Sequence, residues 1–192
     1  MKKLLITGFD PFGGEKINPA WEAVKLLPDT LGEYTLYKLE IPTVFQKAGE
    51  KVLAEAQRLQ PDVILCIGQA GGRAAVTPER VAVNVRDARI DDNEGNRPED
   101  APCVAGGPAA YFSTVPIKKM VAAMKDAGLP AAISDSAGTF VCNDVLYMLL
   151  HSCADSSVKV GFIHVPFLPE QGQPSLALEE TVRGLQVAIG TL

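Results

Sequence analysis

The chain alternates between short runs of apolar residues and segments in which apolar residues recur every three or four positions. Residues 63–67 form a continuous apolar run, which is typical of a strand that is buried on both faces of a parallel sheet. Between residues 44 and 59 the apolar positions are spaced by four and three, which predicts a helix with Thr43 as its N-cap. The same criteria predict further strands at 3–6, 34–41, 80–85, 131–133 and 158–165, and further helices from Asn18-Pro19 onward and at 116–127, 140–152 and 174–189.

This order of strands and helices predicts an α/β fold with helices on both faces of a largely parallel sheet. No repeat, low-complexity tract or linker interrupts the pattern, so we expect one domain spanning residues 1–192. In such sheets the binding site lies at the carboxyl ends of the strands. The segment 87–107 is polar and rich in Gly, Pro, Asp and Asn, and a loop of that length is usually functional or mobile.

Composition and charge exclude several classes of protein. With 192 residues, of which 47% are hydrophobic, the chain can bury a core and is not of the disordered class. No apolar run approaches the roughly 18 residues that span a bilayer, and the run after Lys2-Lys3 is too short for a signal peptide. The net charge is −5 and no block of Lys or Arg stands out, which gives little support to binding of nucleic acid or of an anionic membrane.

The four cysteines favour a reducing, cytoplasmic location, because they show no CxxC spacing that would suggest zinc or a disulfide framework. Cys142 differs from the others in its position. Gly138 and Thr139 predict the start of a helix, which places Cys142 in its third position. There the unpaired N–H groups and the positive end of the helix dipole favour a thiolate. A small buried cysteine is the commoner role of this residue type, so the position supports a nucleophile without establishing one.

Three other residues near strand ends could work with Cys142. His164 ends the last apolar run, which places an imidazole at the carboxyl edge of the sheet, although a hydrogen-bonded core histidine is an equally good interpretation. Glu79 lies at a strand entrance after a Gly-rich turn and could orient an imidazole, although a solvated glutamate is the commoner case. Arg89 could pair with a neighbouring aspartate or reach into a site.

Several segments together resemble the pyroglutamyl peptidase I (pyrrolidone-carboxylate peptidase) family of cysteine peptidases. Their order and spacing match across nearly the whole chain, so the set is far more specific than any single motif. The segments are TGFDPFGG at 7–14, Asn18-Pro19, GQAGGR at 68–73, TPERVAVN at 77–84, DARI at 87–90, AGTFVCN at 137–143 and FIHVP at 162–166.

The resemblance implies a fold and an activity. The family fold is a three-layer α/β/α sandwich with a mixed, mainly parallel central sheet. The implied enzyme is a cysteine exopeptidase that hydrolyses the amide bond after an N-terminal pyroglutamyl residue, through an acyl-enzyme thioester and without a metal or an organic cofactor. Its substrates would be peptides with N-terminal pyroglutamate, and the family is commonly a cytoplasmic homo-oligomer, as a tetramer or a dimer.

The resemblance also implies roles for residues at the matching positions. Cys142 would be the nucleophile, His164 the base and then the acid, and Glu79 the residue that orients the imidazole. Arg89 and nearby backbone N–H groups would stabilise the oxyanion. The residues implied to hold the lactam ring or to shape its pocket are Phe9, Phe12, Asn18, Gln69, Phe140 and Val141. A pyroglutamyl residue has no free α-amine, so an apolar slot with a few hydrogen-bonding groups suits it.

Two other interpretations stay open at this level. A related thiol amidohydrolase would use the same triad on another small lactam or amide, and a panel of substrates would separate it from the peptidase. A non-catalytic binding module that kept the fold would be favoured if Cys142 were alkylated no faster than an ordinary thiol. The intact set of Cys142, His164 and Glu79 argues against that module.

Overall fold

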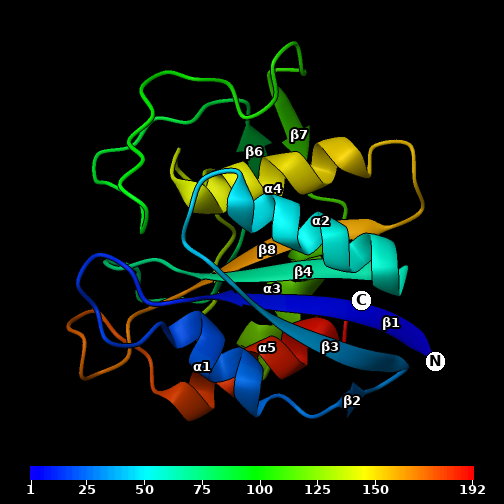
Figure 1. Ribbon diagram of the computed structural model, residues 1–192. Coiled ribbons are helices and arrows are strands. Elements are labelled where there is room, and N and C mark those ends of the chain that lie inside the picture. The colour runs from blue at the N-terminus through cyan, green and yellow to red at the C-terminus, as the bar shows by residue number, and fades with distance from the viewer.

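A six-stranded sheet forms the centre of the molecule, with the strand order β2-β3-β1-β4-β8-β5 (Figure 1). The computed structural model describes all residues from 1 to 192. The elements in chain order are β1 (Lys2–Phe9), α1 (Pro19–Leu26), β2 (Thr30–Leu31), β3 (Tyr34–Ile41), α2 (Lys47–Leu59), β4 (Val63–Gln69), β5 (Thr77–Pro78), β6 (Val81–Val83), β7 (Ala110–Phe112), α3 (Ile117–Asp126), α4 (Val141–Ser152), β8 (Lys159–Val165) and α5 (Leu178–Ile189).

The four long strands β3, β1, β4 and β8 are parallel, whereas the short strands β2 and β5 pair in the antiparallel direction. The sheet is therefore mixed and mainly parallel, which confirms the predicted fold class. Strand β4 has β1 and β8 as neighbours and is buried from Val63 to Gly68. Its continuous apolar run follows from this central position, because both of its faces meet the core.

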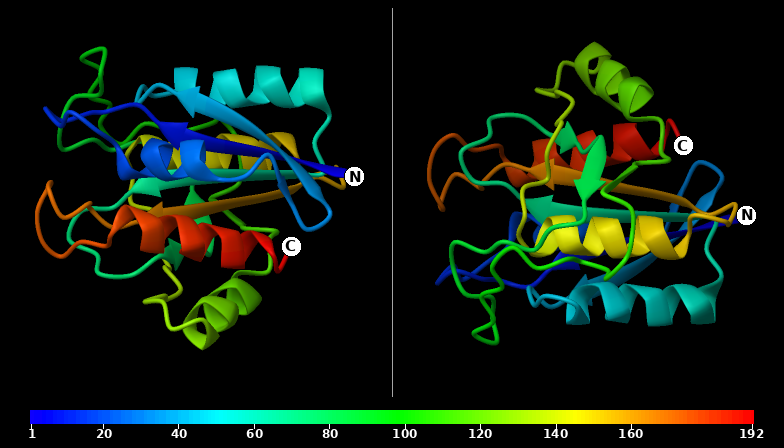
Figure 2. Two further views of the ribbon diagram at one scale, coloured as in Figure 1. Left: turned by 90° about the horizontal axis from the view of Figure 1, so that it is seen from below. Right: turned by 90° about the horizontal axis from the view of Figure 1, so that it is seen from above.

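Helices cover both faces of the sheet. Alternate residues of β1 point to opposite faces, so Leu4 and Ile6 join one apolar core and Leu5 joins the other. Helices α1, α3 and α5 contribute to the first core, and α2 and α4 contribute to the second. The two views of Figure 2 show α1 and α5 across one face and α2 and α4 across the other. None of these helices has the length and apolar character that a membrane crossing requires.

Two helices begin later than the sequence predicts. Thr43 does not cap α2; its backbone N–H and its hydroxyl instead donate to Asp10, at 2.7 and 3.2 Å, so the chain turns once more before the helix starts at Lys47. Helix α5 begins at Leu178, because the segment after Pro174 pairs with Phe167 through Ser175 and Leu176. In both cases a long-range hydrogen bond overrides the local pattern.

Two predicted strands also differ. The strand expected at 80–85 is reduced to β6, which pairs only with β7 in a separate two-stranded sheet. The segment 131–133 forms no strand, and only single bridges at Ala131 and Ser134 connect this region to the chain around β5. Such short pairings depend on segments that are distant in sequence, and hydrophobic periodicity does not report them.

The long polar loop at 87–107 is tied to the rest of the molecule by Asp92. The Asp92 carboxylate accepts hydrogen bonds from the backbone N–H groups of Phe45, Glu94 and Asn96, at 2.9–3.0 Å. The neighbouring Asn93 side chain reaches the segment after β1, where it donates to the Pro11 carbonyl oxygen at 2.9 Å. These bonds fix the loop beside the start of α2, on the side of the sheet where the carboxyl ends lie.

Candidate active site

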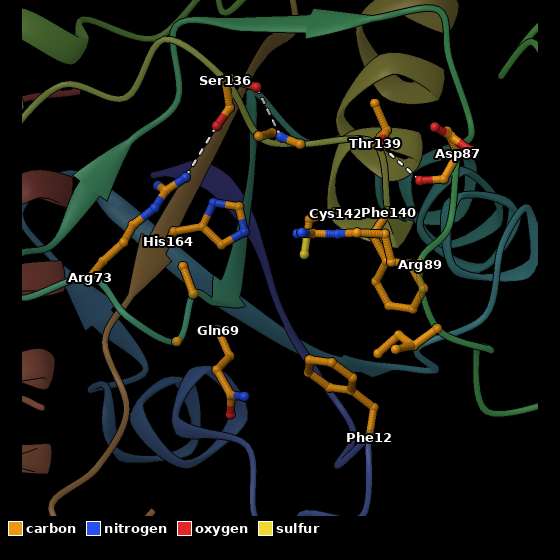
Figure 3. Close-up of a pocket in the computed structure, with 15 residues that line it drawn as sticks. Phe12, Gln69, Arg73, Asp87, Arg89, Ser136, Thr139, Phe140, Cys142 and His164 are labelled. Atoms are coloured by element: carbon orange, nitrogen blue, oxygen red, sulfur yellow. Dashed lines mark hydrogen bonds between the residues drawn. The ribbon is translucent and has the colours of Figure 1, made fainter. Parts of the chain in front are cut away.

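A cavity of about 870 Å³ opens at the carboxyl ends of β4 and β8 (Figure 3). This is the edge at which a parallel sheet is expected to place its site. The lining residues come from separate parts of the chain: Phe12 after β1, Gln69–Gly71 and Arg73 after β4, Asp87, Arg89 and Ile90 from the long loop, Ser136–Phe140 and Cys142 from the α4 entrance, and His164 from β8.

Cys142 is the second residue of α4, one position earlier than predicted. Phe140 is the N-cap and makes no side-chain cap, and the Thr139 hydroxyl donates to the Asp87 carbonyl oxygen at 2.7 Å instead of capping the helix. The first N–H groups of a helix have no partner within it. The N-terminus of α4 therefore presents free donors beside the Cys142 thiol.

The surroundings of Cys142 act against the thiolate that its position in the helix favours. Burial, and after it the negative charge of Glu79, raise the pKa of this thiol to about 12. The positive charge of Arg73 and the Cys142 backbone N–H act in the opposite direction but do not outweigh burial. A base that takes the thiol proton would therefore assist attack on a substrate.

His164 is placed to be that base. Its ring is 4.7 Å from the Phe162 ring, and its Nδ1 lies 2.6 Å from Glu79 Oε1. Because a carboxylate can only accept, Nδ1 carries the proton and Nε2 keeps its lone pair. Figure 3 shows the ring directed into the cavity that Cys142 also lines. No hydrogen bond joins His164 to the sulfur in this structure. Burial lowers the pKa of His164, and the Glu79 carboxylate offsets only part of this effect, so the imidazole is neutral near pH 7.

Arg73 is the functional residue that sequence reasoning missed. Its Nη1 donates to Glu79 Oε1 at 2.8 Å and to Thr77 Oγ1 at 2.7 Å, and its Nη2 donates to the Ser136 carbonyl oxygen at 3.1 Å. Burial alone would raise the pKa of Glu79, but His164, Ser134 and Arg73 hold it below its ordinary value. The only sequence signal for Arg73 is that it ends the GQAGGR segment after β4.

Gly68 is a glycine because the chain passes close to the catalytic side chains. It is paired with His164 in the β4–β8 register. A Cβ at this position would lie 2.6 Å from the Phe162 ring and 3.1 Å from Cys142 Sγ. Only a residue without a side chain leaves room for the Phe162 ring and the Cys142 sulfur at this point of β4.

The structure brings four of the other predicted site residues into the cavity. Phe12 and Phe140 lie with ring centroids 6.1 Å apart and form an apolar wall. Gln69 extends from the end of β4 on the opposite side, as Figure 3 shows. Arg89 is exposed, forms no ion pair with a neighbouring aspartate, and extends into the cavity on the side of Cys142.

Three of the residues predicted to hold the ring or to shape its pocket are not among those that line the cavity. Phe9 is buried in the core against Phe162, with ring centroids 6.1 Å apart. Val141 is fully buried under α4. The Asn18 side chain accepts from the Ala20 backbone N–H and donates to the Asp10 carbonyl oxygen, so it caps α1 and holds the loop that carries Phe12. In this structure all three support the elements around the cavity by packing or by hydrogen bonds.

Comparison with known proteins gives a similarity that spans the whole chain. The sequence model of the family described as pyroglutamyl peptidase matches residues 2–192. The pyrrolidone-carboxylate peptidase of Brevibacillus brevis is 55% identical, with 100% of this chain and 93% of that protein covered. The pyroglutamyl peptidase I of Bacillus amyloliquefaciens superposes with a TM-score of 0.96 at 47% identity, covering 100% of this chain and 96% of that one. The pyrrolidone carboxyl peptidase of Thermococcus litoralis gives a TM-score of 0.96 at 35% identity, covering 100% and 93%.

Proposed function

The chain belongs to the pyroglutamyl peptidase family, and from this premise we propose that the cavity is its active site, with Cys142 and His164 as catalytic residues and Glu79 as a positioning residue. It is a cysteine-type peptidase that removes N-terminal pyroglutamate from peptides. One observation carries the assignment of residues: a cysteine at a helix N-terminus and a histidine held by a buried glutamate face the same cavity.

The first half of the reaction transfers the acyl group to sulfur. His164 Nε2 takes the Cys142 proton as Sγ attacks the carbonyl carbon of the pyroglutamyl residue. The Glu79 carboxylate stabilises the imidazolium that forms. The proton then passes from Nε2 to the nitrogen of the scissile amide, the C–N bond breaks, and the shortened peptide leaves with a free amine. Acid–base help of this kind contributes about 10²–10⁴-fold.

The second half releases pyroglutamate. A water molecule gives a proton to His164 Nε2 as its oxygen attacks the thioester carbonyl carbon. The C–S bond breaks, the sulfur takes the proton back from Nε2, and the carboxylic acid product departs. The neutral resting state of the Cys142 and His164 pair is thereby restored.

The oxyanion that forms in both halves needs donors near Sγ. The free backbone N–H groups at the start of α4 supply fixed donors at that point, and the Arg89 side chain adds a positive charge. Arg89 is placed by its neighbour Asp87, whose backbone exchanges hydrogen bonds with Thr139. We assign the oxyanion site to this group, and removing one such donor generally costs about 3–4 kcal/mol in the barrier.

The apolar wall of Phe12 and Phe140 and the amide of Gln69 suit a lactam ring. A flat five-membered ring gains from contact with aromatic faces, and its carbonyl and N–H groups require hydrogen-bond partners. No acidic side chain is needed to hold an ammonium group, because the α-nitrogen is part of the lactam.

The location and the assembly of the enzyme stay predictions. We propose a cytoplasmic enzyme that acts as one domain over residues 1–192, and its four cysteines, all free, support a reducing compartment. We also propose a homo-oligomer, and the exposed side chains of Phe112 and Ile90 provide apolar surface for contact between subunits.

The proposal is tested by the release of a fluorophore from a pyroglutamyl amide under reducing conditions. Cys142→Ser should abolish turnover, because a serine hydroxyl is a far weaker nucleophile than a thiol beside the same base. Unchanged thermal melting of the variant would show that the fold is intact. A variant that keeps full activity would remove Cys142 from the mechanism.

A further inference from the structure

The side-chain amide of Gln171, which does not line the cavity, is hydrogen-bonded to that of Gln69, which does. Gln171 lies in the segment between β8 and α5, and its Nε2 donates to Gln69 Oε1 at 3.0 Å. The two residues are 102 positions apart in the sequence. This contact deepens the proposed function, on which it rests, because it determines which end of the Gln69 amide faces the substrate.

The orientation of the Gln171 amide is determined by groups that cannot change their role. The Leu168 backbone N–H can only donate, and it lies 3.0 Å from Gln171 Oε1. On the other side, Gln171 Nε2 meets Glu15 Oε2 at 3.3 Å and the Ile17 carbonyl oxygen at 3.4 Å, which can only accept. A flipped amide would place oxygen against two oxygens and nitrogen against an N–H group. Gln171 is therefore a donor toward Gln69.

The donor role of Gln171 determines the orientation of the Gln69 amide. Its oxygen accepts from Gln171, so its nitrogen remains for the cavity, and Nε2 has no hydrogen-bond partner within the protein. Figure 3 shows this nitrogen on the side of Phe12, where the apolar wall begins. A pyroglutamyl ring offers one carbonyl acceptor and one N–H donor. We propose that Gln171 is a positioning residue that orients Gln69 to donate to the ring carbonyl oxygen of the substrate.

The segment that carries Gln171 is well anchored. The Phe167 ring packs on Gly71, where any Cβ would clash with the ring, and Phe167 is bridged to Ser175. The Gln171 backbone N–H donates to the Leu168 carbonyl oxygen at 2.9 Å. The Gln171 side chain is thus held by the same turn that follows the His164 strand, and a substitution at Gln171 can change the amide without releasing the segment.

The first test compares Gln171→Met with Gln173→Met. Methionine has nearly the length of glutamine and cannot hydrogen-bond to Gln69. Gln173 is exposed in the same segment and contacts only Ser175, at 2.8 Å, so it serves as the matched control. Gln171→Met should raise KM for a pyroglutamyl amide by roughly three- to tenfold and leave kcat within about twofold, because ring binding is shared by the ground state and the transition state. Gln173→Met should match the wild type.

The second test inverts the Gln69 amide. Gln171→Glu is made in a Glu15→Gln background, which removes the repulsion between two carboxylates. The new carboxylate can still accept from Leu168, but it cannot donate, so Gln69 should turn its nitrogen outward and its oxygen toward the ring. KM should then rise by more than roughly tenfold relative to Glu15→Gln alone, because two acceptors face each other.

A ring analogue identifies which group of the substrate meets Gln69. A γ-lactone analogue keeps the ring carbonyl and replaces the N–H group with oxygen. If Gln69 donates to the carbonyl, the inverted variant raises KM by the same factor for the lactone and the lactam. An increase for the lactam alone would mean that Gln69 accepts from the ring N–H, and the inference would be wrong.

The outcomes separate this inference from the proposed function. A wild-type enzyme that does not cleave the pyroglutamyl amide contradicts the function itself. An active wild type, with both Gln171 variants folded and equal to their controls in KM, contradicts only the role of Gln171. A fall in kcat at constant KM would also overturn it, because it would show that the segment acts on His164 and not on the ring.

Discussion

Glu79 and Asp144 are both fully buried carboxylates that pair with an arginine, but they are satisfied in different ways. At Asp144 each oxygen has a partner: Oδ1 accepts from Arg86 Nε at 2.7 Å, and Oδ2 accepts from the Gln46 backbone N–H at 2.8 Å. At Glu79, His164 and Arg73 share Oε1, and Oε2 has no partner. The Ser134 hydroxyl helps to lower the pKa of this carboxylate, and it also lies 3.0 Å from the Ser136 carbonyl oxygen.

The difference separates a structural pair from a functional one. Asp144 joins the start of α2 to the first turn of α4, and nothing in its surroundings is left unsatisfied. A buried polar atom without a partner costs about 1–3 kcal/mol, and Glu79 Oε2 is one of three such side-chain atoms, with Thr7 Oγ1 and Thr181 Oγ1. The pair of Glu79 and His164 is instead arranged around a ring whose other nitrogen stays available in the cavity.

The largest expected effects are on kcat, and they distinguish Glu79 from Asp144. His164→Ala should lower kcat by about 10²–10⁴-fold, because it removes the group that moves the proton. Glu79→Gln should lower kcat by less, because orienting the imidazole matters less than proton transfer. Steady-state kinetics measures both, with Asp144→Asn as the matched change at the other carboxylate. A Glu79→Gln variant with unchanged kcat would reduce Glu79 to a structural role and end the contrast.

The second effect is on the free energy of unfolding, which we expect to fall more for the change at Asp144 than for the change at Glu79. Asp144→Asn leaves the largely buried Arg86 guanidinium, 15% exposed, without its counter-charge. Breaking a buried pair costs about 3–5 kcal/mol, and the partial exposure of Arg86 favours the lower end of that range. Denaturant unfolding should show this loss, and kcat at low temperature should stay within about threefold of the wild type. An Asp144→Asn variant that is fully stable but inactive would mean that Asp144 belongs to the catalytic group.

The smallest effect is a shift of the acidic limb of kcat/KM with pH. His164 must be neutral to accept the thiol proton, so activity falls as pH drops through its pKa, which burial places below the ordinary value of 6.5. Glu79 raises this pKa and Arg73 lowers it. Glu79→Gln should therefore move the limb to lower pH and Arg73→Met to higher pH, the latter with a roughly tenfold fall in kcat/KM at the optimum.

The pH profile of the free enzyme measures these shifts, and Arg86→Met provides the control at the structural pair. Limbs that move in the same direction for Glu79→Gln and Arg73→Met would contradict the opposing electrostatic roles. A limb that moves as far in Arg86→Met as in Arg73→Met would show that the shift is not specific to the Glu79 pair.

Much of the fold could be predicted because hydrophobic periodicity is local. The strands β1, β3, β4 and β8 and all five helices were expected close to where they lie. The errors lie where a distant partner takes over. Thr43 donates to Asp10 and does not cap α2. Phe167 pairs with the residues before α5, and β6 pairs only with β7.

The candidate site divides in the same way. Cys142, His164 and Glu79 could be selected because residue type, strand-end position and the collinear motifs agree. The direction of the Cys142 pKa could not, because the helix N-terminus is visible in the sequence whereas burial and the charge of Glu79 are not. Asn18 was expected to help to shape the pocket, and only the structure shows that its amide bonds to Ala20 in α1 and to Asp10 in the loop before it.

The sequence by itself determined the family and the candidate residues, and it predicted that they gather at the carboxyl edge of a parallel sheet. Only the tertiary structure decided which hydrogen-bond partners those residues have. Arg73 reaches Glu79, and Gln171 reaches Gln69, because separate turns pack against each other at the cavity. A hydrogen bond forms only within about 3 Å and at a favourable angle, so its partners are decided by the packing of distant segments and not by their own sequence.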